Sequence, residues 1–247
     1  IGFTNHPSPI LSEKDDSIIY EMHIRDFTID ESSGVINDLR GTYLGAVEEN
    51  TIYKNPYNGK YVKTGIDHLC ELGITHVHLM PIFDFGSVDE RFPGSNNRNW
   101  GYDPKNFNVP EGSYCSNPYN PVTRILELRQ MIMKFHERGI RIVMDMVYNH
   151  MMSTVNMDNI VPGYYFRSDY LGRYTNGSGC GNELASERPM VRKFIIDSCL
   201  HWIKDYKIDG IRFDLMELLD IDTTKEIVKK TTKLDKNFLI YGEPWKG

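Results

Sequence analysis

The chain alternates between apolar runs and longer polar stretches. Five of its apolar runs are rich in Ile, Val, Leu and Met, and each one ends near an acidic residue. Continuous apolar runs of this length are typical of strands that are buried on both faces, as in a parallel sheet. The runs lie at 18–27, 74–85, 140–150, 209–216 and 238–245, and their acids are Asp26, Asp84, Asp145, Asp214 and Glu243.

Segments with helical spacing of apolar residues separate these runs. Strands that alternate with helices are typical of parallel βα units. A capping residue or a proline begins several of the helices, and Gly73 and Gly139 end two of them. The predicted helices lie at 64–72, from Asn120–Pro121 to Gly139, from Ser186 onward, and at about 222–233.

The order of elements predicts an α/β fold, namely about five βα units of a (β/α)8 TIM barrel. Such a barrel places its active site at the C-terminal ends of its strands, so we expect the five acids to point toward one rim. Residues 1–247 are expected to form one partial barrel domain. Long insertions follow the first three strands, at 28–63, 86–119 and 151–184. Their tyrosines and tryptophans suit stacking on flat apolar faces, such as those of sugar rings.

Composition and charge narrow the function classes. The chain has 247 residues, of which 40% are hydrophobic and 25% charged, as in ordinary globular proteins. The net charge is −6, and no five like charges adjoin, which argues against a nucleic-acid or anionic-membrane partner. No stretch reaches the roughly 18 apolar residues of a membrane-spanning helix. We therefore expect no nucleic acid and no membrane among the partners.

The cysteines and histidines do not predict a metal centre. Cys70, Cys115, Cys180 and Cys199 show no CxxC spacing, so we interpret them as free thiols. Free thiols favour a cytoplasmic location, although an extracellular one stays open and the sequence leaves localisation undetermined. His76 and His78 form an HxH pair in the middle of a run. We expect them to lie in the core or behind a site.

The fourth run carries the strongest chemical signal. Arg212 and Asp214 are two residues apart, so they share one face of a strand, and a guanidinium beside a carboxylate keeps that carboxylate ionised. An ionised, oriented carboxylate suits a glycosidase nucleophile. Glu243 follows the apolar run FLIY, and apolar surroundings would raise its pKa, as a general acid requires. On adjacent strands the two carboxyl groups could lie at the roughly 5–5.5 Å separation of a retaining glycosidase.

Taken together, these motifs resemble the α-amylase family of glycoside hydrolases, and within it the debranching pullulanases of type I. The resemblance covers about residues 18–247. It rests on DMVYNH (145–150), GIRFDLM (210–216), YGEPW (241–245) and the loop NWGYDPKNFNVPEGSY (99–114).

The resemblance implies the roles of individual residues. Asp214 would be the nucleophile, Arg212 its partner and Glu243 the acid/base. The substrate-binding residues that we predict are Tyr102, Asp145, His150, Arg212, Trp100 and Trp245.

The chain departs from the family pattern at three points. Arg98 stands where pullulanases usually have a tyrosine, and Leu219 stands where they often have a histidine. The family's third carboxylate follows the seventh strand, whereas this chain ends at Gly247, just after the fifth. We expect the C-terminal half of the barrel to be supplied in the intact protein, and residues 1–247 alone to be inactive.

The function expected from the resemblance is starch or glycogen debranching. The enzyme would be a retaining hydrolase of α-1,6-glucosidic bonds in pullulan, amylopectin or limit dextrins, with an α-glucan as its partner. An α-1,4-acting amylase type and a non-catalytic glucan-binding relative stay open as alternatives, because these relatives share much of the pattern. A metal-dependent barrel hydrolase is opposed by the placement of the histidines.

No cofactor is expected to be required. Calcium binding stays open, with Asp84 and Asp89 as candidate ligands.

Overall fold

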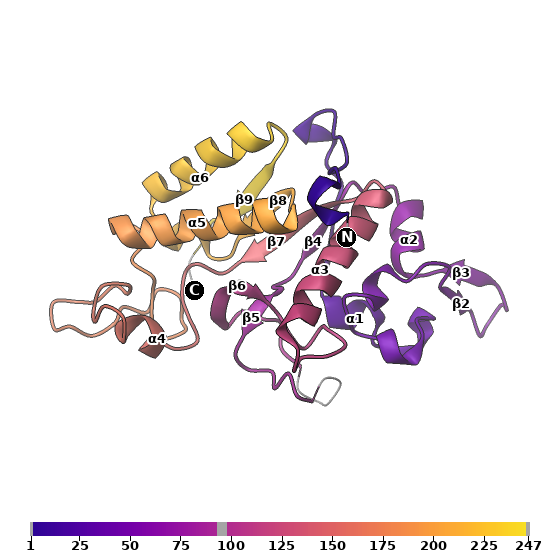
Figure 1. Cartoon of the computed structure of the whole chain (residues 1–247), viewed down its shortest axis with the longest axis horizontal. Helices are drawn as coiled ribbons and strands as arrows, with labels where there is room; N and C mark the ends of the chain where they lie inside the picture. The colour runs from indigo at the N-terminus through magenta and orange to yellow at the C-terminus, as the bar shows by residue number, and fades with distance from the viewer. Residues whose placement is uncertain (1, 93–97, 246–247) are drawn as a thin grey trace.

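A five-stranded parallel sheet forms the centre of the computed structural model, which describes residues 2–92 and 98–245 (Figure 1). Its strands follow the chain order β1-β4-β7-β8-β9, and every neighbouring pair is parallel. The strands are β1 (Ile19–Met22), β4 (His76–Leu79), β7 (Arg141–Met146), β8 (Gly210–Phe213) and β9 (Leu239–Gly242). The predicted parallel βα order is confirmed.

Helices connect these strands as the apolar pattern predicted. Figure 1 shows α3 and α5 crossing in front of the sheet. The helices are α2 (Gly65–Glu71), α3 (Pro121–Glu137), α5 (Pro189–Tyr206) and α6 (Ile221–Leu234). Asn120 caps α3 by accepting a hydrogen bond from the Val122 N–H at 3.1 Å. Helix α5 begins at Pro189, not at Ser186, because the Ser186 hydroxyl accepts from the backbone N–H of Asp220 instead of capping the helix.

All five strands are shorter than their apolar runs, and two of the runs continue into a second element. The run at 74–85 is interrupted at Pro81, which has no N–H to donate to a sheet. After it the chain forms β5 (Phe83–Phe85), which pairs antiparallel with β6 (Pro104–Pro110). The run at 18–27 leaves the sheet after Met22 and enters the short helix α1 (Ile24–Thr28). Asp84 and Asp26 therefore do not stand at strand ends in the way that the sequence predicted.

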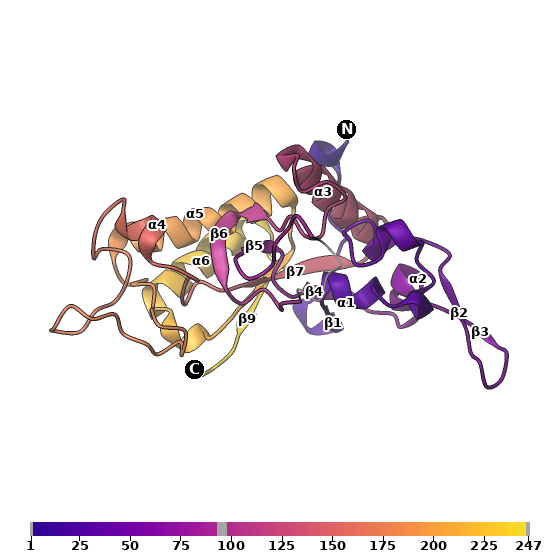
Figure 2. The same ribbon diagram turned by 90° about the horizontal axis from the view of Figure 1, so that it is seen from below.

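The three insertions contain most of the remaining elements, and residues 93–97 of the second insertion lie outside the described part. In Figures 1 and 2 the hairpin of β2 and β3 extends from one end of the molecule and the segment around α4 from the other. The elements are β2 (Ile52–Lys54), β3 (Tyr61–Lys63), α4 (Val155–Asp158), η3 (Glu31–Ser33), η4 (Asn37–Leu39) and η5 (Gly45–Val47); outside the insertions lie η1 (Phe3–Asn5), η2 (Lys14–Asp16) and η6 (Met216–Leu218).

The core lies between the sheet and its helices. Trp202 of α5 is fully buried there and donates its indole N–H to the backbone oxygen of Phe107 at 2.9 Å. All four cysteine thiols are free, as predicted. Within the described ranges, no helix has both the length and the apolar character needed to cross a membrane.

A buried hydrogen bond between a histidine and an aspartate lies at the N-terminal end of the sheet, opposite the strand ends that carry Asp145 and Asp214. His136 of α3 donates from Nε2 to Asp209 Oδ2 at 2.9 Å, and both side chains are almost fully buried. The same Asp209 oxygen accepts the Ile142 N–H of β7 at 2.8 Å. His6 from the N-terminal segment stacks on His136 at 5.3 Å between ring centroids. Asp209 thus joins a helix to the start of a strand.

We expect Asp209→Ala to lower the free energy of unfolding by about 3 kcal/mol, because it leaves a buried imidazole and a buried N–H without their acceptor. Urea denaturation of the full-length protein measures this change. The control is Asp205→Ala, which removes an exposed partner of His201 and should cost less than about 0.5 kcal/mol. Equal losses in the two variants would contradict the role given to Asp209.

Candidate active site

The candidate site lies at the C-terminal ends of β7, β8 and β9. In the sheet register Asp145 of β7 is opposite Arg212 of β8, which in turn is opposite Tyr241 of β9. Ile211 and Phe213 are buried in the core. The side chains of Arg212 and Asp214 therefore project from the other face, as the two-residue spacing predicted.

The Arg212 guanidinium contacts three carboxylates at once. Its Nη1 donates to both oxygens of Asp145 at 2.9 Å and to Asp214 Oδ1 at 3.1 Å. Its Nη2 forms an ion pair with Glu243 Oε1. Burial lowers the pKa of Arg212, but the charge and hydrogen bonds of Asp145 outweigh it, and the net shift is upward. One permanent cation thus holds the two predicted catalytic acids side by side.

Asp214 is a desolvated carboxyl group. Burial raises its pKa to about 6, and the nearby charges of Asp145 and Glu243 act in the same direction. The Asn149 amide donates to Asp214 Oδ2 at 2.8 Å, and this hydrogen bond, together with Arg212, opposes the shift. The sequence predicted a pKa held low by Arg212, and that direction was wrong because burial of Asp214 is the largest effect.

Glu243 sits in polar surroundings, where the sequence predicted apolar ones. Its carboxyl is paired with Arg212 and accepts the Leu215 N–H at 3.1 Å on Oε2. Leu215 follows Asp214 directly and has a φ of 43°, which is uncommon for a residue with a branched side chain. This turn aims the Leu215 N–H at Glu243 and so links the ends of β8 and β9.

Asp145 lies underneath these groups. Its side chain is fully buried, and its Oδ2 accepts from the Tyr102 hydroxyl at 2.9 Å and from His78 Nε2 at 3.2 Å. His78 therefore lies behind the site, as predicted, and His76 is also buried. Asp145 holds Arg212 and Tyr102 in place from below the cleft.

A cleft of about 710 Å³ opens above this arrangement. Six of the eight predicted site residues line it, whereas Asp145 is beneath it and Trp245 is exposed and not among the lining residues. The six are Trp100, Tyr102, His150, Arg212, Asp214 and Glu243. The cleft residues that the sequence did not assign to the site are Glu21, Met22, His23, Met80, Ser178, Cys180 and Leu215. Asp26 was expected there only as one of the five strand-end acids, and Arg98 only as a departure from the family pattern that alters the edge of a subsite.

The residues that the sequence analysis missed, Asn149 behind the cleft among them, differ in how clearly the sequence indicated them. Asn149 stands inside the quoted motif DMVYNH, next to His150, so its polar side chain after an apolar strand was a usable signal. Ser178 and Cys180 belong to the third insertion, where no spacing connects them to the strand ends.

Burial lowers the pKa of His150, which favours its neutral form in the cleft.

Asp84 lies apart from the cleft, in a separate group of acids. Its carboxylate and those of Glu90 and Glu111 lie within 4.8 Å of one another, which is close enough to hold a metal ion. Burial raises the pKa of Glu111 to about 7. Arg124 donates to both oxygens of Glu90, at 2.7 and 2.6 Å, so part of the negative charge is already neutralised. Asp89, the other predicted calcium ligand, pairs with Arg91.

Comparison with known proteins gives relatives over nearly the whole chain. A family model described as "Alpha amylase, catalytic domain" matches residues 60–161. The chain is 47% identical to a pullulanase of Bacillus subtilis over 232 residues, which is 93% of this chain and 31% of the relative. It is 37% identical to a chloroplastic isoamylase 3 of Oryza sativa over 83% of this chain and 26% of the relative.

Solved structures of pullulanases are similar to this chain in both fold and sequence. The crystal structure of a pullulanase from Paenibacillus barengoltzii, in complex with maltohexaose and α-cyclodextrin, superposes with a TM-score of 0.93 at 47% identity and covers 99% of this chain and 37% of that one. A pullulanase from Bacillus acidopullulyticus gives a TM-score of 0.92 at 47% identity, over 100% of this chain and 29% of that one.

The chain spans about a third or less of the length of the Bacillus subtilis and Oryza sativa relatives. Its parallel strands and the motifs at their ends lie in the part that matches. The expected family and fold are confirmed: the chain belongs to the α-amylase family of glycoside hydrolases, in its pullulanase subfamily, and its five parallel strands are part of a (β/α)8 barrel.

Proposed function

We propose that the protein carrying this chain is a retaining hydrolase of α-1,6-glucosidic bonds in pullulan, amylopectin or limit dextrins. The observation that carries the proposal is the Arg212 guanidinium, which holds Asp214 and Glu243 together in one cleft. Two carboxyl groups beside a scissile bond are what retaining glycosidases use. The cleft also offers Trp100 and Tyr102 as aromatic surfaces for an α-glucan.

We assign the roles of the two acids as the resemblance to the family implies. Glu243 protonates the leaving oxygen while Asp214 forms the covalent glycosyl-enzyme, and Glu243 then activates water for its hydrolysis. Asp214 must be ionised to attack, and Arg212 and Asn149 favour that form. Arg212 is in turn oriented by Asp145.

The relatives support this substrate class. Those found are named pullulanases and isoamylases, and solved pullulanases were crystallised with maltohexaose, maltotetraose or maltotriose. These ligands are α-glucans, the class proposed for this cleft. Residues 1–247 are proposed to be one partial catalytic domain, which the rest of the barrel completes in the intact protein.

The proposed chemistry uses protein side chains alone, because the two carboxyl groups supply nucleophile, acid and base. Calcium binds carboxylate oxygens, and the group of Asp84, Glu90 and Glu111 offers such oxygens outside the cleft. A calcium ion there would support the second insertion and take no part in bond cleavage. The acids whose oxygens gather around Asp84 are Glu90 and Glu111, so we propose these two, and not Asp89, as its partners in binding calcium.

Asp214→Asn in the full-length protein should reduce pullulan hydrolysis by at least about 10³-fold, because the nucleophile acts only during the reaction. Binding of maltotetraose should persist. Reducing-end release and isothermal calorimetry measure the two effects. Asp197→Asn, which changes an exposed acid of α5, is the control and should leave both unchanged. Hydrolysis by Asp214→Asn near the normal rate would refute its assignment.

Tyr102 allows stacking to be separated from hydrogen bonding. Tyr102→Phe keeps the ring and removes only the hydroxyl that donates to Asp145, whereas Tyr102→Ala removes both. We expect Tyr102→Ala to lower kcat/KM by about 10- to 100-fold and Tyr102→Phe to lower it much less. Equal losses in steady-state kinetics on pullulan would show that the ring itself contributes nothing.

The acid limb of kcat/KM should lie near pH 6, because the buried nucleophile must lose its proton and the pKa of Asp214 is raised to about 6. Asn149→Ala removes a hydrogen bond that favours the charged form, so it should move this limb to higher pH. A pH–rate profile of both proteins measures the shift. A limb that stays in place or moves to lower pH would contradict this account of Asp214.

A further inference from the structure

An ion pair at the edge of the cleft connects two separate parts of the chain. Arg98 Nη2 lies 2.5 Å from Asp26 Oδ2, which joins the segment between β5 and β6 to helix α1. Both residues line the cleft that also contains Asp214 and Glu243. The side chains are 51% and 30% exposed, so solvent and a bound ligand can both reach the pair.

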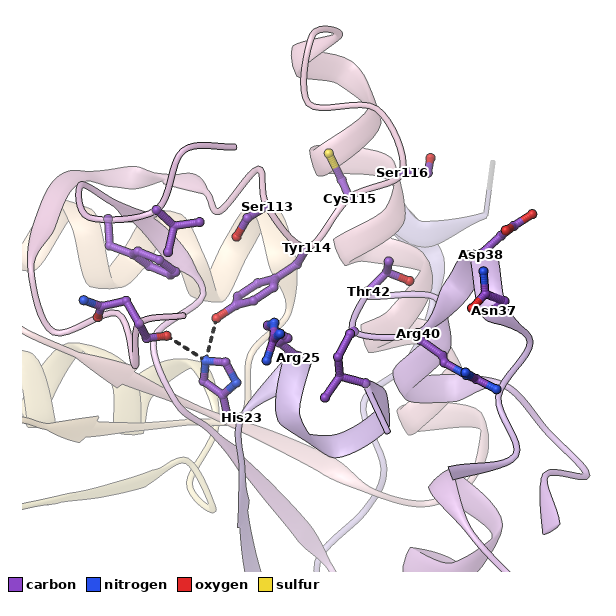
Figure 3. Close-up of a pocket in the computed structure, with 15 residues that line it drawn as sticks. His23, Arg25, Asn37, Asp38, Arg40, Thr42, Ser113, Tyr114, Cys115 and Ser116 are labelled. Atoms are coloured by element: carbon purple, nitrogen blue, oxygen red, sulfur yellow. Dashed lines mark hydrogen bonds between the residues drawn. The ribbon is translucent and has the colours of Figure 1, made fainter. Parts of the chain in front are cut away.

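His23 holds the backbone at Asn99, which follows Arg98, and the backbone at Asp26. The backbone oxygen of Asn99 accepts from His23 Nε2 at 3.1 Å, and His23 Nδ1 accepts the Asp26 N–H at 3.2 Å. His23 Nε2 also lies 2.9 Å from the Tyr114 hydroxyl. Figure 3 marks this contact with a dashed line. Because His23 contacts Asp26 itself and Asn99 next to Arg98, it sets the spacing between the segment and the helix.

Gly101 also constrains the backbone that follows Arg98. Gly101 has a φ of 94°, and a Cβ atom there would lie 2.8 Å from Pro81 Cβ and 2.9 Å from Phe85 Cδ1. Only glycine combines this backbone with so close an approach. Tyr102 is then tied to Asp145 through its hydroxyl. The direction of the Arg98 side chain is therefore decided mainly by Asp26.

Among the residues that the structure describes, Asp26 alone is an ion-pair partner of the Arg98 guanidinium, which leaves further N–H groups for a ligand. A guanidinium has five N–H groups in a planar fork. The remaining donors are at the cleft surface, close in sequence to the exposed ring of Trp100. Neighbouring hydroxyl groups of a sugar are acceptors whose spacing such a fork can match.

We propose that Arg98 is a substrate-binding residue that donates hydrogen bonds to hydroxyl oxygens of the α-glucan, and that Asp26 is the positioning residue that aims it. This inference rests on the proposed function and adds a contact outside the bond-breaking groups. Asp26 is shared between two arginines, since Arg25 Nη1 donates to its Oδ1 at 3.1 Å while Arg98 contacts its Oδ2.

The first test compares Arg98→Ala with Arg91→Ala in the full-length protein. Arg91 forms an equally short, exposed pair with Asp89 in the same insertion but does not line the cleft, so it is a matched control. We expect Arg98→Ala to raise KM for pullulan roughly 3- to 10-fold with kcat within about twofold, and Arg91→Ala to change neither. Thermal unfolding should be unchanged in both variants, because exposed pairs contribute little stability. An unchanged KM, or a loss confined to kcat, would overturn the proposal.

The second test is a double-mutant cycle with Asp26→Asn. If Asp26 acts only by aiming Arg98, its substitution should raise KM less than Arg98→Ala does, and the double variant should match Arg98→Ala alone. Additive effects of the two substitutions would overturn the positioning role. Arg98→Lys, which keeps the charge and loses the planar fork, should restore KM only in part.

The third test separates this inference from the proposed function. Maltotetraose binding is measured by calorimetry in the Asp214→Asn background, with and without Arg98→Ala, so that no turnover is needed. A weaker affinity in the Arg98→Ala protein supports the inference, and an equal affinity overturns it while the proposed function stands. A protein that neither cleaves pullulan nor binds maltotetraose overturns both.

Discussion

The arrangement of the site depends on one buried guanidinium. Asp145, Asp214 and Glu243 end three neighbouring strands, and three carboxylates at this spacing would repel one another without a cation between them. Arg212 contacts all three, with its side chain only 10% exposed. Burying a charge is unfavourable unless it is paired and hydrogen-bonded, so each of these groups depends on the others. The parallel sheet supplies the register that brings them together.

The same burial sets the reactivity of Asp214. Removal of water raises its pKa, while Arg212 and the Asn149 amide favour its charged form, and the result is a carboxyl group poised near pH 6. Glu243 is more exposed and borders the cleft. Two acids on adjacent strands thus differ in environment, which is the usual way in which one site assigns different roles to like groups.

Buried polar contacts lie at both ends of the sheet, and they have different roles. At the far end Asp209 accepts from His136 Nε2 and from the Ile142 N–H and lies 3.6 Å from Arg141 Nε, and these contacts connect α3 to β7. At the cleft end, Arg212 shares its donors among three acids that border or underlie an open space. The contact between His136 and Asp209 thus connects two elements, whereas Arg212 orients the side chains that border the cleft.

The sequence by itself determined the parallel strand–helix order and the projection of Arg212 and Asp214 from one face, because both depend on local periodicity along the chain. The motifs also brought Glu243 to the same rim. Tertiary structure alone decided that Asp84 lies outside the cleft and that Glu243 is surrounded by polar groups. It also decided that Arg98 meets Asp26. These outcomes depend on how long insertions fold back over the sheet, and residues that are far apart in the chain leave no periodic signal of their contact.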